Sequence, residues 1–292
     1  MYELKQVGEN TFYMESPAKI GLYRLNEHEV VLIDSGSDKD AGRKVRQILD
    51  REGWSLRAIY NTHSNADHIG GNAYLQKQKG CPVYAPGIEA AFTNYPCLEP
   101  SFLYGGFPPA ALRNKFLMAR SSLCEELKAE DLPEGFEIIP LPGHFFDMAG
   151  FRTPDDVVFL ADCLSSKATL DKYKIGFIYD VQAYLETLEK VKQLKAAQFV
   201  PAHASATDSV AELAQCNIDT VQEIGDTIVE LLQNPMIFED LLKALFDRYE
   251  LKMNFDQYVL VGSTVRSYLA WLEGQGRVSH AFVANRLLWQ AV

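Results

Sequence analysis

The chain has 292 residues, of which 47% are hydrophobic and 23% are charged, and its formal net charge is −11. A chain of this length can bury a substantial core and has room for one large domain and a smaller one. The acidic balance disfavours a nucleic-acid backbone as the main partner, because phosphate binding requires a basic surface.

The N-terminal part is predicted to alternate strands with helices. Apolar and alternating runs predict strands at residues 11–14, 18–24 and 29–34, and helical spacing predicts a helix at 40–52. A strand at 56–60, a helix at 72–79 and a strand at 82–85 follow. This alternation favours a layered α/β or α+β fold over a helical bundle.

Residues 87–135 interrupt the alternation. The segment 95–109 is rich in proline, glycine and aromatic residues, and a helix is predicted at 110–121. Long insertions of this kind are commonly functional, and this one is too aromatic for a disordered segment. We interpret it as a cap over a pocket, with a surface or homodimer contact as the alternative. The aromatic residues that could face a substrate, or equally pack in the core, are Tyr95, Phe102, Tyr104, Phe107 and Phe116.

Strands are predicted again at 137–141, 157–161 and 198–201, with a helix at 181–195. From residue 207 the pattern is helical, with helices at 209–233, 237–251 and 261–273, and it ends in a hairpin at 277–290. We therefore divide the chain into domains 1–207 and 208–292. The second resembles a winged-helix module, but its last 58 residues carry six basic and six acidic side chains, which favours packing over DNA binding.

The start of the chain lacks the pattern of a signal peptide, and no apolar run reaches the length of a membrane span. The five cysteines are an odd number and form no Cys-x-x-Cys pair, which favours free thiols over a disulfide framework. We therefore expect a cytoplasmic protein with no membrane partner.

Residues with metal-ligand chemistry follow four of the predicted strands. Three of them, His63, Asp67 and His68, lie within six residues directly after the strand at 56–60. Further apolar runs lead to His144, Asp162 and His203. Loops at strand ends present functional groups on a rigid scaffold, and imidazole and carboxylate groups bind zinc or iron.

Together these segments resemble the metallo-β-lactamase-fold superfamily of metallohydrolases, in its glyoxalase II-like or uncharacterised hydrolase branch. The family signature is His-x-His-x-Asp-His after a strand, then Gly-His, then Asp, then a final His. The matching positions are His63, Asn65, Asp67, His68, His144, Asp162 and His203. Residues 31–36 resemble the upstream strand that ends in Asp-x-Gly, with Asp34 as its carboxylate. The resemblance covers residues 1–207 and implies a four-layer αβ/βα sandwich with metals in a cleft at one edge.

The resemblance also implies roles for these residues. The first metal would be bound by His63, residue 65 and His144, and the second by Asp67, His68 and His203, with Asp162 bridging. One or two zinc ions are expected, with iron or manganese as alternatives. Asp67 would orient or deprotonate the attacking water, and Asp34 would fix the tautomer of a histidine ligand.

Asn65 departs from the signature, because the family has histidine there. An amide oxygen is a weaker zinc donor than imidazole. Our hypothesis is that the second pocket fills first and that the first is weak, exchangeable or empty. The alternative is that Asn65 coordinates the metal with little consequence.

The resemblance, the acidic balance and the aromatic cap favour a hydrolase of a small ester, thioester or lactone-like substrate. Three alternatives remain open. One is a phosphodiesterase or ribonuclease of the same fold, another is a persulfide-oxidising enzyme with a single iron, and the third is a degenerate protein that binds without turnover. Penicillin-type hydrolysis is disfavoured because those enzymes are usually exported.

Overall fold

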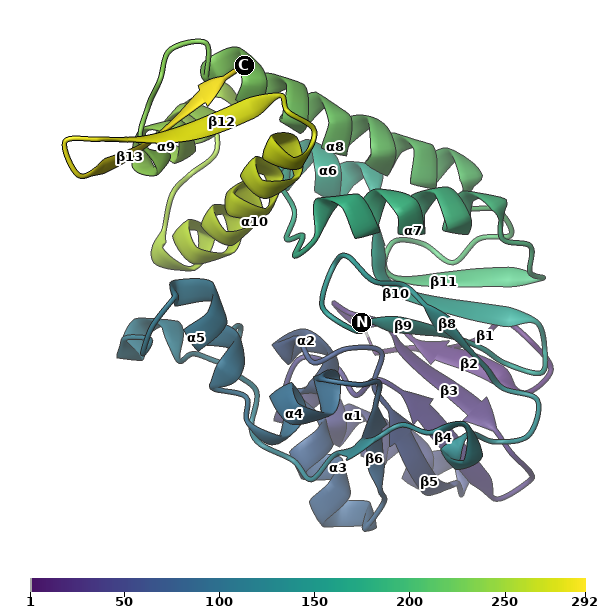
Figure 1. Cartoon of the computed structure of the whole chain (residues 1–292). Coiled ribbons are helices and arrows are strands. Elements are labelled where there is room, and N and C mark those ends of the chain that lie inside the picture. Colours follow the sequence, from purple (N-terminus) through teal and green to yellow (C-terminus); the bar gives the residue numbers. More distant parts are fainter. Residues whose placement is uncertain (1) are drawn as a thin grey trace.

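A computed structural model of the chain describes residues 2–292 and contains two β-sheets packed face to face, each covered by helices on its outer side (Figure 1). The four layers run helix, sheet, sheet, helix, and a mainly helical C-terminal region follows. This architecture confirms the predicted fold class.

The first sheet has seven strands whose spatial order follows the sequence. Neighbouring strands from β1 to β4 are antiparallel, and those from β4 to β7 are parallel. Parallel neighbours require a crossover, and α1 (Lys39–Glu52) and α3 (Asn72–Lys79) provide the first two. The strands are β1 (Leu4–Gln6), β2 (Thr11–Met14), β3 (Ile20–Arg24), β4 (Glu29–Ile33), β5 (Ser55–Tyr60), β6 (Val83–Ala85) and β7 (Glu125–Glu126).

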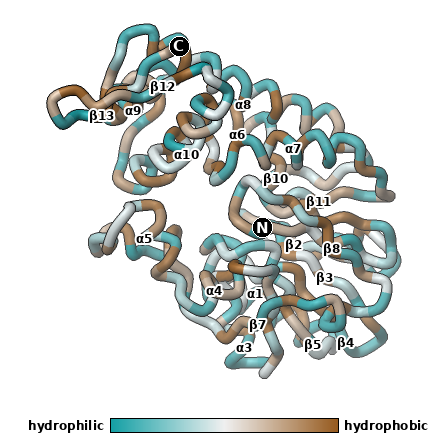
Figure 2. Tube along the Cα trace, in the orientation of Figure 1, coloured by the Kyte–Doolittle hydropathy of each residue, from teal (hydrophilic) through white to brown (hydrophobic). Residues whose placement is uncertain are grey.

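The second sheet has four strands in the order β11-β10-β9-β8. Its outer face is covered by α7 (Val181–Gln193) and α8 (Ala211–Leu231), while Tyr60, Phe151 and Phe159 belong to the cluster between the two sheets. Buried positions recur along α8 at helical spacing, and Figure 2 shows hydrophobic and hydrophilic positions alternating along this helix. The strands are β8 (Glu137–Pro140), β9 (Ala149–Arg152), β10 (Val157–Ser165) and β11 (Gln198–His203).

The predicted helix at 110–121 is wrong. The insertion contains α4 (Glu89–Asn94) and α5 (Leu98–Tyr104), and then only a 3-10 turn, η1 (Ala110–Leu112). The side chain of Asn114 accepts a hydrogen bond from the backbone N–H of Phe116, which turns the chain where a helix would continue. A second 3-10 turn, η2 (Ala129–Asp131), follows near the end of the insertion.

The C-terminal region contains α9 (Phe238–Arg248), α10 (Phe255–Gly274) and the hairpin of β12 (Val278–Val283) and β13 (Arg286–Ala291). Helix α10 begins six residues before its predicted start, because Asn254 caps it by accepting from the N–H of Gln257. A short helix, α6 (Lys167–Tyr173), was not predicted.

One hydrophobic cluster runs from the second sheet through α7 and α8 to α9 and α10. Leu103, Leu112 and Leu117 of the insertion form another cluster with Val259 of α10. The insertion and the C-terminal region therefore pack against each other (Figure 1). The division at residue 207 stays a prediction. Among residues 2–292, no helix is both long and apolar enough to cross a membrane.

Candidate metal centre

The structure brings all seven predicted ligand positions together at one edge of the sandwich. Ligand atoms of Asp67, His68, Asp162 and His203 lie within 4.8 Å of one another. The ligand atoms of His63, His144 and Asp162 form a second such group. Because Asp162 belongs to both groups, the arrangement is that of two neighbouring pockets with a shared carboxylate.

Distances within these groups suit a divalent metal. Nε2 of His68 lies 3.0 Å from Oδ1 of Asp162, and Nε2 of His203 lies 3.1 Å from Oδ2 of Asp162 and 3.3 Å from Oδ2 of Asp67. Ligand atoms placed tetrahedrally around zinc at its usual bond lengths lie roughly 3.3–3.4 Å apart.

Three of the candidate ligand atoms are buried and have no hydrogen-bond partner within residues 2–292, namely Nε2 of His63, Nε2 of His68 and Oδ1 of Asp162. Unpaired buried polar atoms are uncommon in folded proteins, because leaving them unsatisfied costs free energy. One cation in each of the two groups would satisfy these atoms. The residues present therefore fit a metal ion.

Asp34 fixes the orientation of His68. It follows β4 directly, and its backbone adopts a left-handed conformation with φ +64°. Its carboxylate accepts hydrogen bonds from the N–H and hydroxyl of Thr62, each at 2.8 Å, and from Nδ1 of His68 at 2.7 Å. Because Nδ1 of His68 carries the proton, Nε2 is left free to face the metal pockets.

Local backbone distortions place the ligands from the second sheet. Ala161 has φ +49°, and the pairing of β10 with β11 is irregular at this residue, next to Asp162. A non-glycine residue in this conformation costs on the order of 1–3 kcal/mol, and such strain concentrates at functional sites. On β11, Nδ1 of His203 donates to the carbonyl of Pro17 at 2.9 Å, which turns Nε2 toward the carboxylates.

The site keeps two carboxylates ionised. Partial desolvation opposes ionisation of Asp67, but His68 and a hydrogen bond from His203 lower its pKa to about 2. Asp162 is largely enclosed, with 11% of its side chain exposed, and the imidazoles of His203 and His68 hold its pKa well below the ordinary value. Both groups are therefore anionic at neutral pH, as metal binding requires.

Residues 15–203 match the family model of the metallo-beta-lactamase superfamily, which covers more than half of the chain. The chain belongs to the metallo-beta-lactamase superfamily. This confirms the family predicted from the ligand motifs, and the match ends at His203, the last of the predicted ligands.

Curated relatives of this metallo-beta-lactamase superfamily chain include the "probable metallo-hydrolase" of Bacillus subtilis, which is 25% identical over 66% of this chain and 80% of its own length. A hydroxyacylglutathione hydrolase of Rhodopseudomonas palustris is 44% identical over 46% of this chain. The alignment spans only 45% of that relative, and 21% of the corresponding enzyme of Nitrobacter winogradskyi.

Solved structures of the same superfamily share the fold over almost the whole chain. A beta-lactamase domain protein from Burkholderia ambifaria superposes with a TM-score of 0.73 at 15% identity, over 99% of this chain and 94% of its own. A metallo-beta-lactamase family protein from Thermus thermophilus gives 0.72 at 17% identity, over 99% and 98%. The likeness therefore includes the C-terminal helices.

Two buried glutamates from the insertion hold the metallo-beta-lactamase motif loop between His63 and Asp67. Glu89 of α4 accepts from the N–H and hydroxyl of Ser64 at 3.0 and 2.6 Å, and from the N–H of Asp147 at 2.9 Å. Burial raises the pKa of Glu89 to about 7. Through its hydrogen bonds to Ser64 and Asp147, Glu89 joins the loop that carries His63 to the loop that carries His144.

Glu99 of α5 contacts Asn65, the residue that departs from the family signature. It accepts a hydrogen bond from Nδ2 of Asn65 at 2.9 Å, while Oδ1 of Asn65 lies 3.1 Å from Nε2 of His144. Burial, together with the Asp67 carboxylate, raises the pKa of Glu99 well above its ordinary value. Our sequence reasoning missed both glutamates. The one available signal was an acidic residue among apolar neighbours, and no spacing links either of them to the motif.

A cleft of about 480 Å³ opens onto Asp67, His144 and Asp162. Of the five aromatic residues considered for the substrate pocket, Phe116 lines this cleft. Phe102 packs against Phe146 and Tyr179, and Tyr104 against Phe255, and both line a separate groove. Tyr95 and Phe107 lie on the surface, with 65% and 81% of their area exposed, and do not line the cleft.

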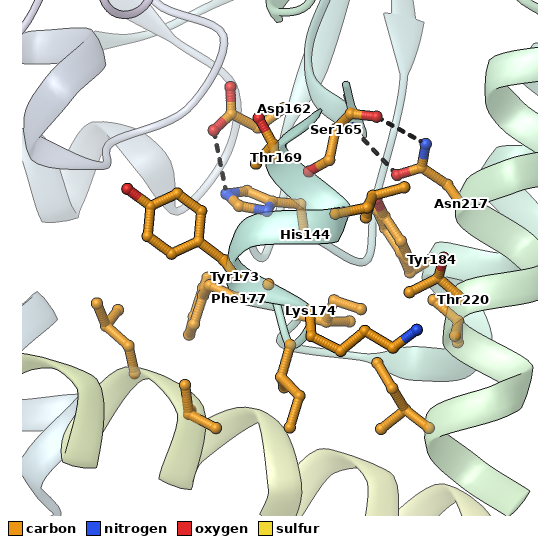
Figure 3. A pocket seen from close by; sticks show the side chains of 18 of the residues that line it. His144, Asp162, Ser165, Thr169, Tyr173, Lys174, Phe177, Tyr184, Asn217 and Thr220 are labelled. Atoms are coloured by element: carbon orange, nitrogen blue, oxygen red, sulfur yellow. Dashed lines mark hydrogen bonds and ion pairs between the residues drawn. The ribbon is translucent and has the colours of Figure 1, made fainter. Parts of the chain in front are cut away.

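A second cavity of about 220 Å³ lies against His144, Asp162 and His203. Figure 3 shows Asp162 and His144 beside it, with Asn217 and Thr220 projecting from α8. Asn217 is fixed by two hydrogen bonds to the backbone of Ser165, at 3.0 and 2.9 Å. The candidate metal ligands are therefore accessible from two hollows, and the C-terminal helices form part of the smaller one.

Proposed function

We propose that the protein is a metal-dependent hydrolase that cleaves a small ester, thioester or lactone. The observation that carries this proposal is the pair of ligand groups that share Asp162 at the base of a partly apolar cleft. One or two zinc ions are the preferred occupants, with iron or manganese as alternatives.

A divalent metal in such a site lowers the pKa of a coordinated water and polarises the substrate carbonyl. The chain's own residues supply the rest. Asp67 is ionised, and 40% of its side chain is exposed, so it can orient the attacking water and accept its proton. Asp34 keeps the proton of His68 on Nδ1, away from the reacting groups.

The charges in the cleft favour a neutral acyl substrate over a phosphodiester. Its lining includes four carboxyl side chains, Asp38, Asp67, Glu99 and Asp162, and a single lysine. That lysine, Lys115, is paired with Asp38 at 3.1 Å. Among the described residues that line the cleft, no unpaired cationic side chain is left to bind the anionic oxygen of a phosphodiester, whereas an ester or thioester requires none.

The smaller cavity supports an apolar acyl group. Its lining includes Leu164, Ile178, Val221 and Leu260 next to the metal ligands. Tyr268 also lines it. Its buried hydroxyl has no partner in the part of the chain that the structure describes, so it can donate to a polar atom of the substrate. Relatives named hydroxyacylglutathione hydrolases remove an acyl group from glutathione, which agrees with this substrate class.

The proposal is tested with zinc-loaded protein and a panel of substrates: acetyl and hexanoyl esters of p-nitrophenol, an acyl thioester, a γ-lactone and bis(p-nitrophenyl) phosphate. We expect turnover of an acyl substrate that chelation abolishes and zinc restores. Preferential cleavage of the phosphodiester would support the alternative function. A protein that binds metal but turns over none of the panel would be a non-catalytic binder.

Filling the smaller cavity should change the preference for acyl length. Val221 of α8 is buried in its wall, and Val221→Phe adds a ring that occupies the space for a longer chain. We expect kcat/KM for the hexanoyl ester to fall by about 10–200-fold, the range that small volume changes in apolar pockets produce. The acetyl ester is the internal control and should be affected far less. Equal losses of kcat/KM for both esters would show that the acyl group does not bind in this cavity.

A further inference from the structure

The first metal pocket lacks the histidine that its family signature places at position 65, yet the structure provides a substitute. We propose that Glu99 is a positioning residue that holds the amide of Asn65 with its oxygen toward the first pocket, so that this oxygen completes the ligand set of His63, His144 and Asp162. The inference rests on the metal centre of the proposed function and is independent of the substrate.

The contacts of Asn65 specify the orientation of its amide. Its Oδ1 lies 3.1 Å from Nε2 of His144, a separation close to that expected between two ligands of one tetrahedral metal. Its Nδ2 donates to Oε1 of Glu99 at 2.9 Å, on the opposite side of the amide. Oε1 of Glu99 accepts from this N–H₂ group on one side and His144 contacts the amide oxygen on the other, so the two contacts together hold this orientation of the amide.

The side chain of Asn65 does not form the helix-capping hydrogen bond that is usual at its position. It is the N-cap residue of α2 (Ala66–Ile69), where an asparagine side chain normally accepts a hydrogen bond from the first turn. No such bond forms here. A cap of this kind stabilises a helix, so a competing interaction must hold the amide in the pocket. The contacts with Glu99 and His144 are that interaction.

The arrangement is similar to one that is common in metal sites, where a histidine ligand donates its distal N–H to a carboxylate that orients the ring. Here an amide replaces the imidazole, and Glu99 replaces the orienting carboxylate. Because Glu99 belongs to α5, the ligand set of the first pocket depends on the insertion being packed in place. Glu99 is buried, which excludes water that would otherwise compete for the Nδ2 hydrogen of Asn65.

The test is zinc titration of the full-length chain after chelator treatment, followed by calorimetry and by metal analysis after dialysis. We expect the parent protein to bind two ions. In Glu99→Ala the dissociation constant of the first pocket should rise by about 10–100-fold, the usual effect of removing a ligand's hydrogen-bond partner, while the second pocket is unchanged. Glu99→Gln retains an oxygen acceptor for Nδ2 and should bind two ions nearly as the parent does.

A double-mutant cycle with Asn65→Ala separates orientation from a merely structural role. If Glu99 acts through Asn65, adding Glu99→Ala to Asn65→Ala causes no further loss of zinc. The inference would be overturned if Glu99→Ala caused the same loss of zinc affinity in the Asn65→Ala background as in the parent. It would also be overturned if Glu99→Ala weakened both pockets, or if the parent protein bound one ion at saturating zinc. If the second pocket still binds zinc in these cases, the inference about Glu99 fails but the metal centre required by the proposed function is retained. If the parent binds none, the proposed function fails with it.

Discussion

Asp67→Ala is expected to reduce kcat/KM for any hydrolysed acyl substrate by about 10²–10⁴-fold, the range over which a positioned general acid–base group acts. The carboxylate is ionised, lies 3.3 Å from Nε2 of His203 and is exposed to the cleft. Under the proposed function, its removal takes away both a ligand of the second pocket and the group that orients the water. Steady-state kinetics on the best panel substrate measures the change.

The control is Asp40→Ala, which removes a carboxylate that is exposed on α1 and paired with Arg43 at 2.8 Å. That variant should keep parental activity, because Asp40 lies outside the cleft lining. Metal analysis of Asp67→Ala at saturating zinc then separates lost metal from lost proton transfer. Unchanged kcat/KM in Asp67→Ala would contradict the proposed mechanism, in which Asp67 orients the attacking water and accepts its proton.

The largest stability effect is expected from Gly143→Ala. Gly143 has φ +117°, and a Cβ at this position would lie 2.2 Å from the backbone nitrogen and 2.4 Å from the Cα of Tyr184 in α7. Its carbonyl also accepts from the N–H groups of Tyr179 and Asp180. Backbone strain and a clash with fixed backbone atoms together should lower the free energy of unfolding by about 2–5 kcal/mol.

Denaturant unfolding measures this effect. Gly176→Ala is the matched control, because a Cβ there meets no atom within 4 Å and the residue has no positive φ. Since Gly143 precedes His144, the variant should also bind zinc more weakly in the first pocket. Equal stability of the two alanine variants would show that the loop relaxes without cost and that its packing against α7 does not position His144.

Local sequence patterns located the secondary structure where a segment's own residues decide its conformation. Helix α3 at residues 72–79 has the predicted bounds, and the strands before the ligand loops lie where apolar runs predicted them. The prediction failed at residues 110–121, where Asn114 turns the chain and Leu112 and Leu117 pack against α10 instead. Such contacts join segments that are far apart in sequence, so local spacing could not reveal them.

The same distinction applies to the candidate site. The residue types at the predicted strand ends, together with the resemblance of their motifs to the metallo-β-lactamase signature, predicted which groups would meet. The sequence also located the anomaly at Asn65. It could not show that Asn65 directs its oxygen toward His144, since Glu99, which holds the amide, lies 34 residues away in an insertion with no recognisable pattern.

By itself, then, the sequence determined the layered α/β class from the alternation of its elements. It determined the family and the seven converging positions from the resemblance of its motifs to the metallo-β-lactamase signature. Tertiary structure alone decided three further features. These are the pairing of Glu99 with Asn65, the cavity shared with α8 and α10, and the placement of four of the five aromatic residues outside the cleft. Each depends on packing between segments that are distant in sequence, and the free energy of such contacts is set by burial and geometry that local residue order does not encode.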